Sequence, residues 1–86
     1  MRNPMEVVNK MSEIEGLPID VKDRLHWLFD DFSYKAPEQA SSCFLRLSNY
    51  CNDVLPFPPK EDWQIKLAAL LMDKSVAEIK QLVEEE

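Results

Sequence analysis

Glycine, histidine and cysteine are nearly absent from this chain. Gly16 is the only glycine among 86 residues, His26 is the only histidine, and Cys43 and Cys51 are the only cysteines. A glycine-rich loop that cradles a phosphate group cannot form with one glycine, which excludes the common nucleotide-binding motifs. A zinc site usually takes four ligands, often Cys or His at close spacing, so the sequence predicts no metal and no cofactor.

Catalysis needs a nucleophile, a base or a metal held among converging polar groups, and the supply of such side chains is small. A pairing of Cys43 with His26 in the fold is left open, but no nucleophile motif surrounds either residue. We therefore predict that the chain is not an enzyme. If one helix carries both Cys43 and Cys51, they lie about 12 Å apart, which exceeds the Cα separation of about 7 Å that a disulfide allows. Both are expected to be reduced thiols.

Positive charge is also scarce. Ten Lys and Arg residues face sixteen Asp and Glu residues, which gives a net charge of -6. The chain lacks the positive field that holds phosphates, so direct nucleic-acid binding is disfavoured. No apolar run approaches the roughly 18 residues that cross a bilayer, and the first residues do not form a secretory signal. We expect no membrane contact and a location in the reducing cytoplasm.

The residues that are present favour a single helical domain over residues 1–86. The chain is 45% hydrophobic, its length suits one core, and no strand-like alternation or hairpin turn occurs. Apolar residues recur at three- and four-residue intervals, which is typical of amphipathic helices. The pattern predicts an all-α fold, a compact bundle of about five short helices. The fourth should be central, because it is apolar on all sides from Trp63 to Met72.

Proline, glycine and capping residues set the expected boundaries of the first three helices. The first should begin near Pro4 and end at Gly16, a typical C-cap residue. Asp20 is expected to cap the second helix, which should close near Lys35. The third should then run from about residue 37 to residue 52, since proline suits the first position of a helix.

The segment 55–59 is expected to be a loop, because three prolines in four residues forbid both a helix and a central strand. Pro59 can begin the fourth helix, and Ser75 and Glu78 form a capping box for the fifth. We predict that Phe57 tucks down over the bundle. The alternative is that the loop docks into an aromatic groove as a polyproline segment.

An aromatic and acidic face is predicted on the second helix. Trp27 and Tyr34 are seven residues apart, so they lie on nearly the same side of the helix, and Asp23, Asp30 and Asp31 flank them. Aromatic residues supply contact area and carboxylates supply steering, a composition that suits a partner protein with a basic surface. The alternative is that another helix packs over Trp27 and makes this side part of the core.

The segment 67–79 resembles the helix-turn-helix family, within a stretch of roughly twenty residues. The resemblance is carried by the opening Leu67-Ala68-Ala69-Leu70-Leu71 and by the Ser75-capped helix that follows. It implies DNA reading by the fifth helix. The segment departs from the family in lacking a turn glycine and in having one residue more than the usual spacing. The fifth helix also offers only Lys80 and Gln81 before it runs into the glutamates 84–86, which would repel DNA.

The leading interpretation is a non-enzymatic interaction protein, a small acidic regulator, adaptor or inhibitor. Its size and acidity would suit a phage- or plasmid-type inhibitor of a nucleic-acid machine, since carboxylates can imitate a phosphate backbone. The alternative is a DNA-associated transcription regulator, in which two copies gather Lys66, Lys74 and Lys80 on one surface. A homodimer is left open, because the fourth helix has more apolar faces than a monomer of this size needs.

Overall fold

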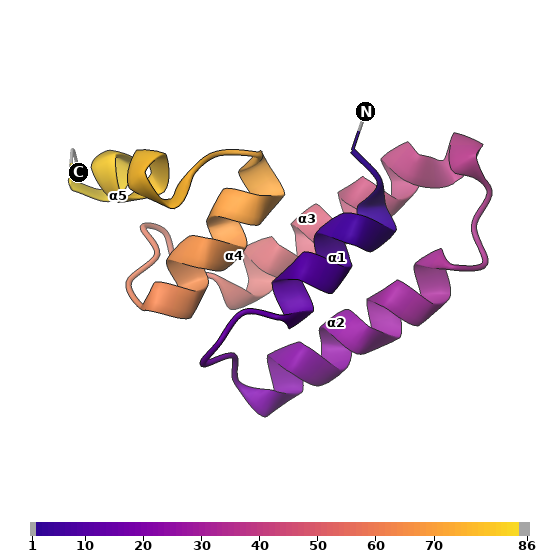
Figure 1. Ribbon diagram of the computed structural model, residues 1–86, viewed down its shortest axis with the longest axis horizontal. Helices are drawn as coiled ribbons and strands as arrows, with labels where there is room; N and C mark the ends of the chain where they lie inside the picture. The colour runs from indigo at the N-terminus through magenta and orange to yellow at the C-terminus, as the bar shows by residue number, and fades with distance from the viewer. Residues whose placement is uncertain (1, 85–86) are drawn as a thin grey trace.

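The computed structural model describes residues 2–84, which form an all-α bundle without strands in that range. Figure 1 shows α1 lying along α2, with α3 behind and α5 extending away from the rest of the bundle beside α4. The elements in order are α1 (Pro4–Ser12), α2 (Ile19–Phe32), a 3-10 turn η1 (Pro37–Gln39), α3 (Ala40–Val54), α4 (Asp62–Met72) and α5 (Val76–Glu84).

A large core joins the first four helices. Alpha helices with one apolar stripe must bury that stripe against a neighbour, and here α1 packs most closely on α2 while α4 contacts α1, α3 and α5. The predicted all-α bundle with α4 as a central element is therefore confirmed. Twelve buried residues form this core: Val7, Val8, Met11, Val21, Leu25, Leu28, Phe32, Cys43, Leu47, Cys51, Trp63 and Leu67.

The first two helix boundaries differ from the prediction. The helix α1 ends at Ser12, because the amides of Glu13 and Ile14 bond back to the carbonyls of Lys10 and Met11 and so tighten the last turn. Gly16 lies beyond the helix and adopts a left-handed φ of 85° in the connecting turn.

The predicted cap of the second helix is also wrong. The N-cap of α2 is Pro18, whose carbonyl accepts the first helical hydrogen bond from the amide of Lys22. Asp20 instead lies within the first turn, where its negative charge is attracted to the positive end of the helix dipole. At the other end, α2 stops at Phe32, and i→i+3 bonds carry the chain on to Lys35.

The later boundaries are closer to the prediction. The third helix begins as the turn η1 and continues as α3 to Val54, two residues beyond the expected end. The fourth begins at Asp62 rather than Pro59, and the buried Gln64 accepts hydrogen bonds from the amides of Lys60 and Glu61. The side chain of Gln64 thus satisfies backbone donors that would otherwise be left without partners.

The predicted capping box at the start of α5 is confirmed. The amide of Glu78 donates to the Ser75 hydroxyl at 3.1 Å, and the amide of Ser75 donates to the Glu78 carboxylate at 3.1 Å. These bonds hold the carboxylate in its charged form, so the pKa of Glu78 is lowered.

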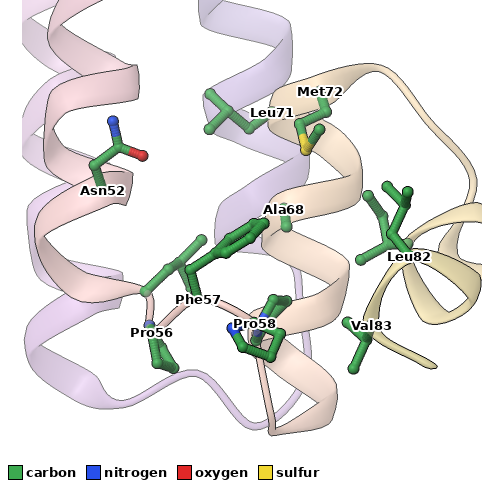
Figure 2. Close-up of a pocket in the computed structure, with 12 residues that line it drawn as sticks. Asn52, Pro56, Phe57, Pro58, Ala68, Leu71, Met72, Leu82 and Val83 are labelled. Atoms are coloured by element: carbon green, nitrogen blue, oxygen red, sulfur yellow. The ribbon is translucent and has the colours of Figure 1, made fainter. Parts of the chain in front are cut away.

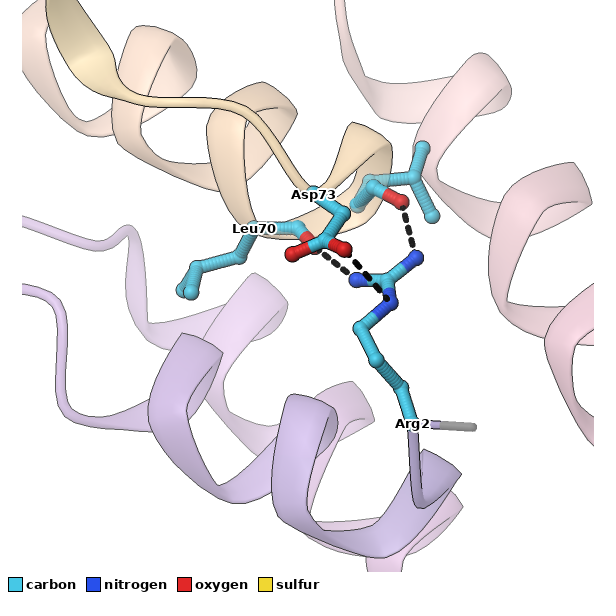
Figure 3. A network of polar contacts seen from close by, with 4 residues as sticks. Arg2, Leu70 and Asp73 are labelled. Atoms are coloured by element: carbon cyan, nitrogen blue, oxygen red, sulfur yellow. Dashed lines mark hydrogen bonds and ion pairs between the residues drawn. The ribbon is translucent and has the colours of Figure 1, made fainter.

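Arg2 fastens the beginning of the described chain to the end of α4 (Figure 3). Its guanidinium donates to the carbonyl of Leu70 and, at 2.9 Å, to the carbonyl of Leu71. Its Nε lies 4.0 Å from the carboxylate of Asp73, and its guanidinium carbon Cζ lies 5.3 Å from the centre of the Phe44 ring. Arg2 therefore supplies positive charge at the negative end of the α4 dipole.

None of the described helices has the length and apolar character that a bilayer crossing requires.

Candidate interaction surfaces

Trp27 lies on the outer side of α2 with 50% of its surface exposed. Two guanidinium groups stack near its ring: Arg24 from the same helix at 4.9 Å and Arg46 from α3 at 5.5 Å from the ring centre. No helix covers the ring completely, so the alternative that Trp27 is a core residue is wrong. The tryptophan is held by cation–π contacts while half of it stays open to solvent.

The same two arginines connect α2 to α3. Arg24 also lies 5.8 Å from the ring of Tyr50, and Arg46 lies 5.7 Å from the ring of Phe32. Arg46 in addition donates to the carboxylate of Asp31. Asp31 was predicted to face a partner, but the structure pairs it with a cation of the chain itself. Asp31 is therefore part of the α2–α3 contact.

The remaining predicted residues stay on the surface, and their charges are segregated. Because a helix turns about 100° per residue, Asp23 and Asp30 lie about 40° and 60° to one side of Trp27. Arg24 lies on the other side of the ring, with Arg46 reaching it from α3. Tyr34 lies in the turn after α2, so the helical spacing that was predicted to align it with Trp27 does not apply there, and it is 82% exposed. We call Trp27, Asp23 and Asp30, together with the predicted Tyr34, the Trp27 face.

Sequence reasoning missed the two arginines of this surface. Arg24 stands three residues before Trp27, a spacing that brings two side chains of a helix together, so a local signal for it existed. Arg46 has no such signal, because it reaches Trp27 from another helix. The sequence predicted that only carboxylates flank Trp27, whereas in the structure the ring has an acidic edge and a cationic edge.

The nucleophilic side chains are dispersed. Cys43 and Cys51 are both buried free thiols, and burial raises the pKa of Cys51 to about 12, so little of this reactive thiolate forms near neutral pH. His26 is exposed beside the turn at Gly16, whereas Cys43 borders a separate hollow near Arg2. The structure therefore does not bring Cys43 and His26 to one cavity. Among residues 2–84, no group of three or more potential metal-ligating side chains is placed to hold an ion.

The helix-turn-helix resemblance can be followed in the turn between α4 and α5. Asp73 adopts the left-handed conformation, φ 56°, that the absent glycine would favour, and the amide of Lys74 bonds to the carbonyl of Ala69. Lys66, however, pairs with Asp62 at 2.9 Å. The pKa of Asp62 is lowered mainly by that hydrogen bond and charge, with a smaller effect from Lys80. Two of the three lysines expected to face DNA thus act on a carboxylate of the chain.

A second surface is an apolar groove between the proline-rich loop, α4 and α5 (Figure 2). Its volume is about 590 Å³. Phe57 stands at this groove with 83% of its surface exposed, so the prediction that it tucks down over the bundle is wrong. The ends of the loop are packed, since Pro59 is buried and Leu55 packs against both apolar clusters, and only its middle projects into solvent. We call this feature the Phe57 groove.

No protein-family model, no curated protein and no solved structure matches this chain.

Proposed function

We propose that this chain is a non-enzymatic protein–protein interaction module, a small acidic regulator, adaptor or inhibitor that binds a partner through the Trp27 face. The observation that carries the proposal is the half-exposed Trp27 ring held by cation–π contacts with Arg24 and Arg46. Tryptophan is among the residues that contribute most to binding when a partner covers them. A ring that is already fixed loses less conformational entropy on binding than a free one.

The partner should carry a basic surface where it meets the acidic edge of the Trp27 face. Asp23 and Asp30 are exposed on that edge, and the chain has a net charge of -6 that attracts cations from a distance. Such charges mainly raise the association rate and select the partner, while the aromatic contact supplies most of the affinity. This combination suits an inhibitor of a nucleic-acid machine, whose binding site is basic. We therefore propose an inhibitor of the kind that a phage or plasmid would encode.

The test is capture of partners by the immobilised chain, followed by measurement of the binding kinetics of the captured protein. The variant Trp27→Ala/Tyr34→Ala should weaken binding by at least about tenfold, whereas Phe57→Ala, which removes an exposed aromatic ring elsewhere on the surface, should not. Asp23→Lys/Asp30→Lys avoids the arginine contacts and should mainly slow association. Equal binding of wild type and all of these variants would contradict the proposal.

A cytoplasmic location belongs to the same proposal. The two cysteines are free thiols inside the core, as expected for a chain that works in a reducing compartment. Localisation of the full chain by a C-terminal fluorescent fusion tests this part.

The second candidate, DNA-associated regulation through α4 and α5, rests on the tight turn at Asp73 and the capped start of α5. It has weaker support, because Lys66 is paired with Asp62 and Lys80 also acts on that carboxylate. A gel shift at low salt tests it. Bands that weaken steeply as salt rises would favour DNA contact, since phosphate neutralisation releases counterions.

A further inference from the structure

The turn between α4 and α5 lacks the residues that usually end a helix. No glycine or proline occurs between Asp62 and Glu84, the residues that bound the two helices together. Helices commonly end at a glycine in the left-handed conformation, often with a proline soon after it. Here Asp73 adopts that conformation, with φ 56°, although its Cβ atom makes the conformation sterically unfavourable. The sequence therefore does not itself forbid one continuous helix across the turn.

Two hydrogen bonds decide whether the helix continues or bends. Most side chains of the segment 62–84 belong to the good helix formers, such as Leu, Ala, Lys, Glu and Gln. In a continuous helix each amide donates to the carbonyl four residues earlier. The amide of Lys74 would then donate to Leu70, and the amide of Ser75 would donate to Leu71.

Arg2 occupies both of these acceptors. Its guanidinium donates to the carbonyls of Leu70 and Leu71, and Figure 3 shows it reaching the end of α4 from the beginning of the described chain. Its charge lies at the negative pole of the helix dipole, a pole that exists at this place only because the helix stops here. The carboxylate of the left-handed residue, Asp73, lies 4.0 Å from the Arg2 Nε. Arg2 thus stabilises the bend from a distant part of the sequence.

The two amides that would continue the helix also have other partners. The amide of Lys74 donates to the carbonyl of Ala69 at 2.9 Å, and the amide of Ser75 donates to the Glu78 carboxylate at 3.1 Å. The burial of Ile79 against α4 favours the bend as well, although this second apolar cluster is small. The bend is therefore held by few contacts, and at this turn Arg2 supplies the polar contacts that come from outside the two helices.

We propose that Arg2 controls a switch between two conformations of residues 62–84, the bent pair of helices α4 and α5 and a single continuous helix. While Arg2 is bound, the bent pair is favoured. When Arg2 leaves, the freed carbonyls accept from the next amides of the helix, Asp73 takes an ordinary helical φ, and α5 moves away from its place beside α4. Two packings of one sequence that differ little in free energy form such a switch, and a ligand shifts the balance toward the conformation it prefers.

The switch determines whether the Phe57 groove exists. Ile79, Leu82 and Val83 of α5 line one side of the groove, so the groove is complete only while the bend is kept. In the described chain α5 contacts no helix except α4, so its movement leaves the large core in place. The Trp27 face lies on α2 and should be the same in both conformations. Arg2 is therefore a positioning residue for the groove alone.

NMR spectroscopy of the purified full chain tests the proposal, because Cα chemical shifts distinguish a helical residue from a residue in a turn. Arg2→Met should move the shifts of residues 73–75 toward helical values and raise the ratio of continuous to bent helix by at least about tenfold, since it removes two hydrogen bonds from a charged donor. Relaxation dispersion extends the measurement to minor populations. Arg2→Lys should have a smaller effect, because an ammonium group keeps the charge but lacks the planar fork of donors.

The matched control is Asn3→Ala at the adjacent residue. The Asn3 side chain accepts from the amide of Met5 and caps α1, so this variant weakens the beginning of the chain without touching α4. The shifts of residues 73–75 should stay at their wild-type values.

Two variants of Asp73 separate a switch from a simple anchor of the N-terminal segment. Asp73→Gly in the Arg2→Met background should restore the bend, because glycine adopts a positive φ freely and is unfavourable inside a helix. Asp73→Ala with Arg2 intact should favour the continuous helix, because alanine is the best helix former. The side chain of Asp73 is exposed, so neither variant disturbs the core.

Three results would overturn the proposal. The first is an Arg2→Met chain whose residues 73–75 keep turn shifts and show no minor helical state in relaxation dispersion. The second is an Arg2→Met chain in which α5 takes random-coil shifts, which would show that α5 unfolds instead of joining α4. The third is a double variant Arg2→Met/Asp73→Gly in which the continuous helix persists.

Discussion

Two faces of α4 belong to parts of the molecule that are packed very differently. One face supplies Trp63 and Leu67 to the large core that α1, α2 and α3 share, and Leu70 and Leu71 pack against the same core. The other face supplies Ala68 and Ala69 to a small second cluster that contains Ile79 of α5. In the described chain, α4 is the only helix that α5 contacts.

The difference places the two interaction surfaces on supports of unequal strength. The Trp27 face lies on α2, whose opposite side fills the large core, whereas one wall of the Phe57 groove is a helix held by a single neighbour. Elements with few buried contacts open at a lower free energy than the global unfolding of the protein. We therefore expect a rigid Trp27 face and a groove whose width can change as α5 moves.

The largest effect should come from removing side chains of the same size from the two clusters. Leu25 and Ile79 are both buried, but Leu25 belongs to the large core and Ile79 to the small one. Leu25→Ala should lower the free energy of unfolding by about 3 kcal/mol in urea titrations. Ile79→Ala should lower it less, because α5 can detach while the large core stays folded.

Amide hydrogen exchange provides the control for this pair. In Ile79→Ala, exchange should accelerate within α5, and the amides of α1 and α2 should keep their protection. Loss of protection to the same extent in every helix would show that the two clusters unfold as one unit, and the comparison would then fail.

High pH should act on the large core through Cys51. Burial raises the pKa of this thiol from 9.0 to about 12, so between these values the unfolded chain releases a proton that the folded chain keeps. The contribution of the neutral Cys51 thiol to the free energy of unfolding is fully present below pH 9 and is lost as the pH rises toward 12. Wild type should lose on the order of 1 kcal/mol per pH unit in this window.

Cys51→Ala removes the titrating group and should flatten this part of the stability curve, although the variant starts from a lower value because it leaves a cavity. Parallel curves for the two proteins between pH 9 and 11 would contradict the assignment.

The smallest effect should be confined to the start of α5. Ser75→Ala removes the hydroxyl that accepts from the amide of Glu78, which should destabilise α5 by about 1 kcal/mol. Because the pKa of Glu78 is lowered from 4.5, its contribution is present above that pH and is lost as the pH falls through the lowered value. Protection factors in α5, corrected for the intrinsic pH dependence of amide exchange, should therefore fall more between pH 6 and pH 3 in wild type than in Glu78→Gln.

Local features of the fold could be predicted from the sequence. The capping box at Ser75 and the break at the prolines 56–59 depend on neighbouring residues, and both occur where the sequence places them. The ends of α1 and α2 are also local, but in each case the last turn tightens to i→i+3 bonding, and composition does not reveal where that change occurs.

Features that join distant segments could not be predicted in the same way. The stacking of Arg46 on Trp27 depends on how α3 lies beside α2, and periodicity specifies the buried face of each helix but not its neighbour. The exposure of Phe57 has a similar origin. The sequence predicts that this aromatic ring tucks over the bundle, but here Leu55 and Pro59 are the loop residues that pack inward, and the ring between them stays in solvent.

The bonds from Arg2 to Leu70 and Leu71 bear on how the chain folds during its synthesis. These partners leave the ribosome 68 and 69 residues after Arg2. At about 5–20 residues per second, the first helix waits roughly 3 to 14 s for them. Meanwhile α1 can pair with α2, which follows it directly in the chain and packs on it most closely. A nascent helical hairpin can thus form before Arg2 is fastened to the end of α4.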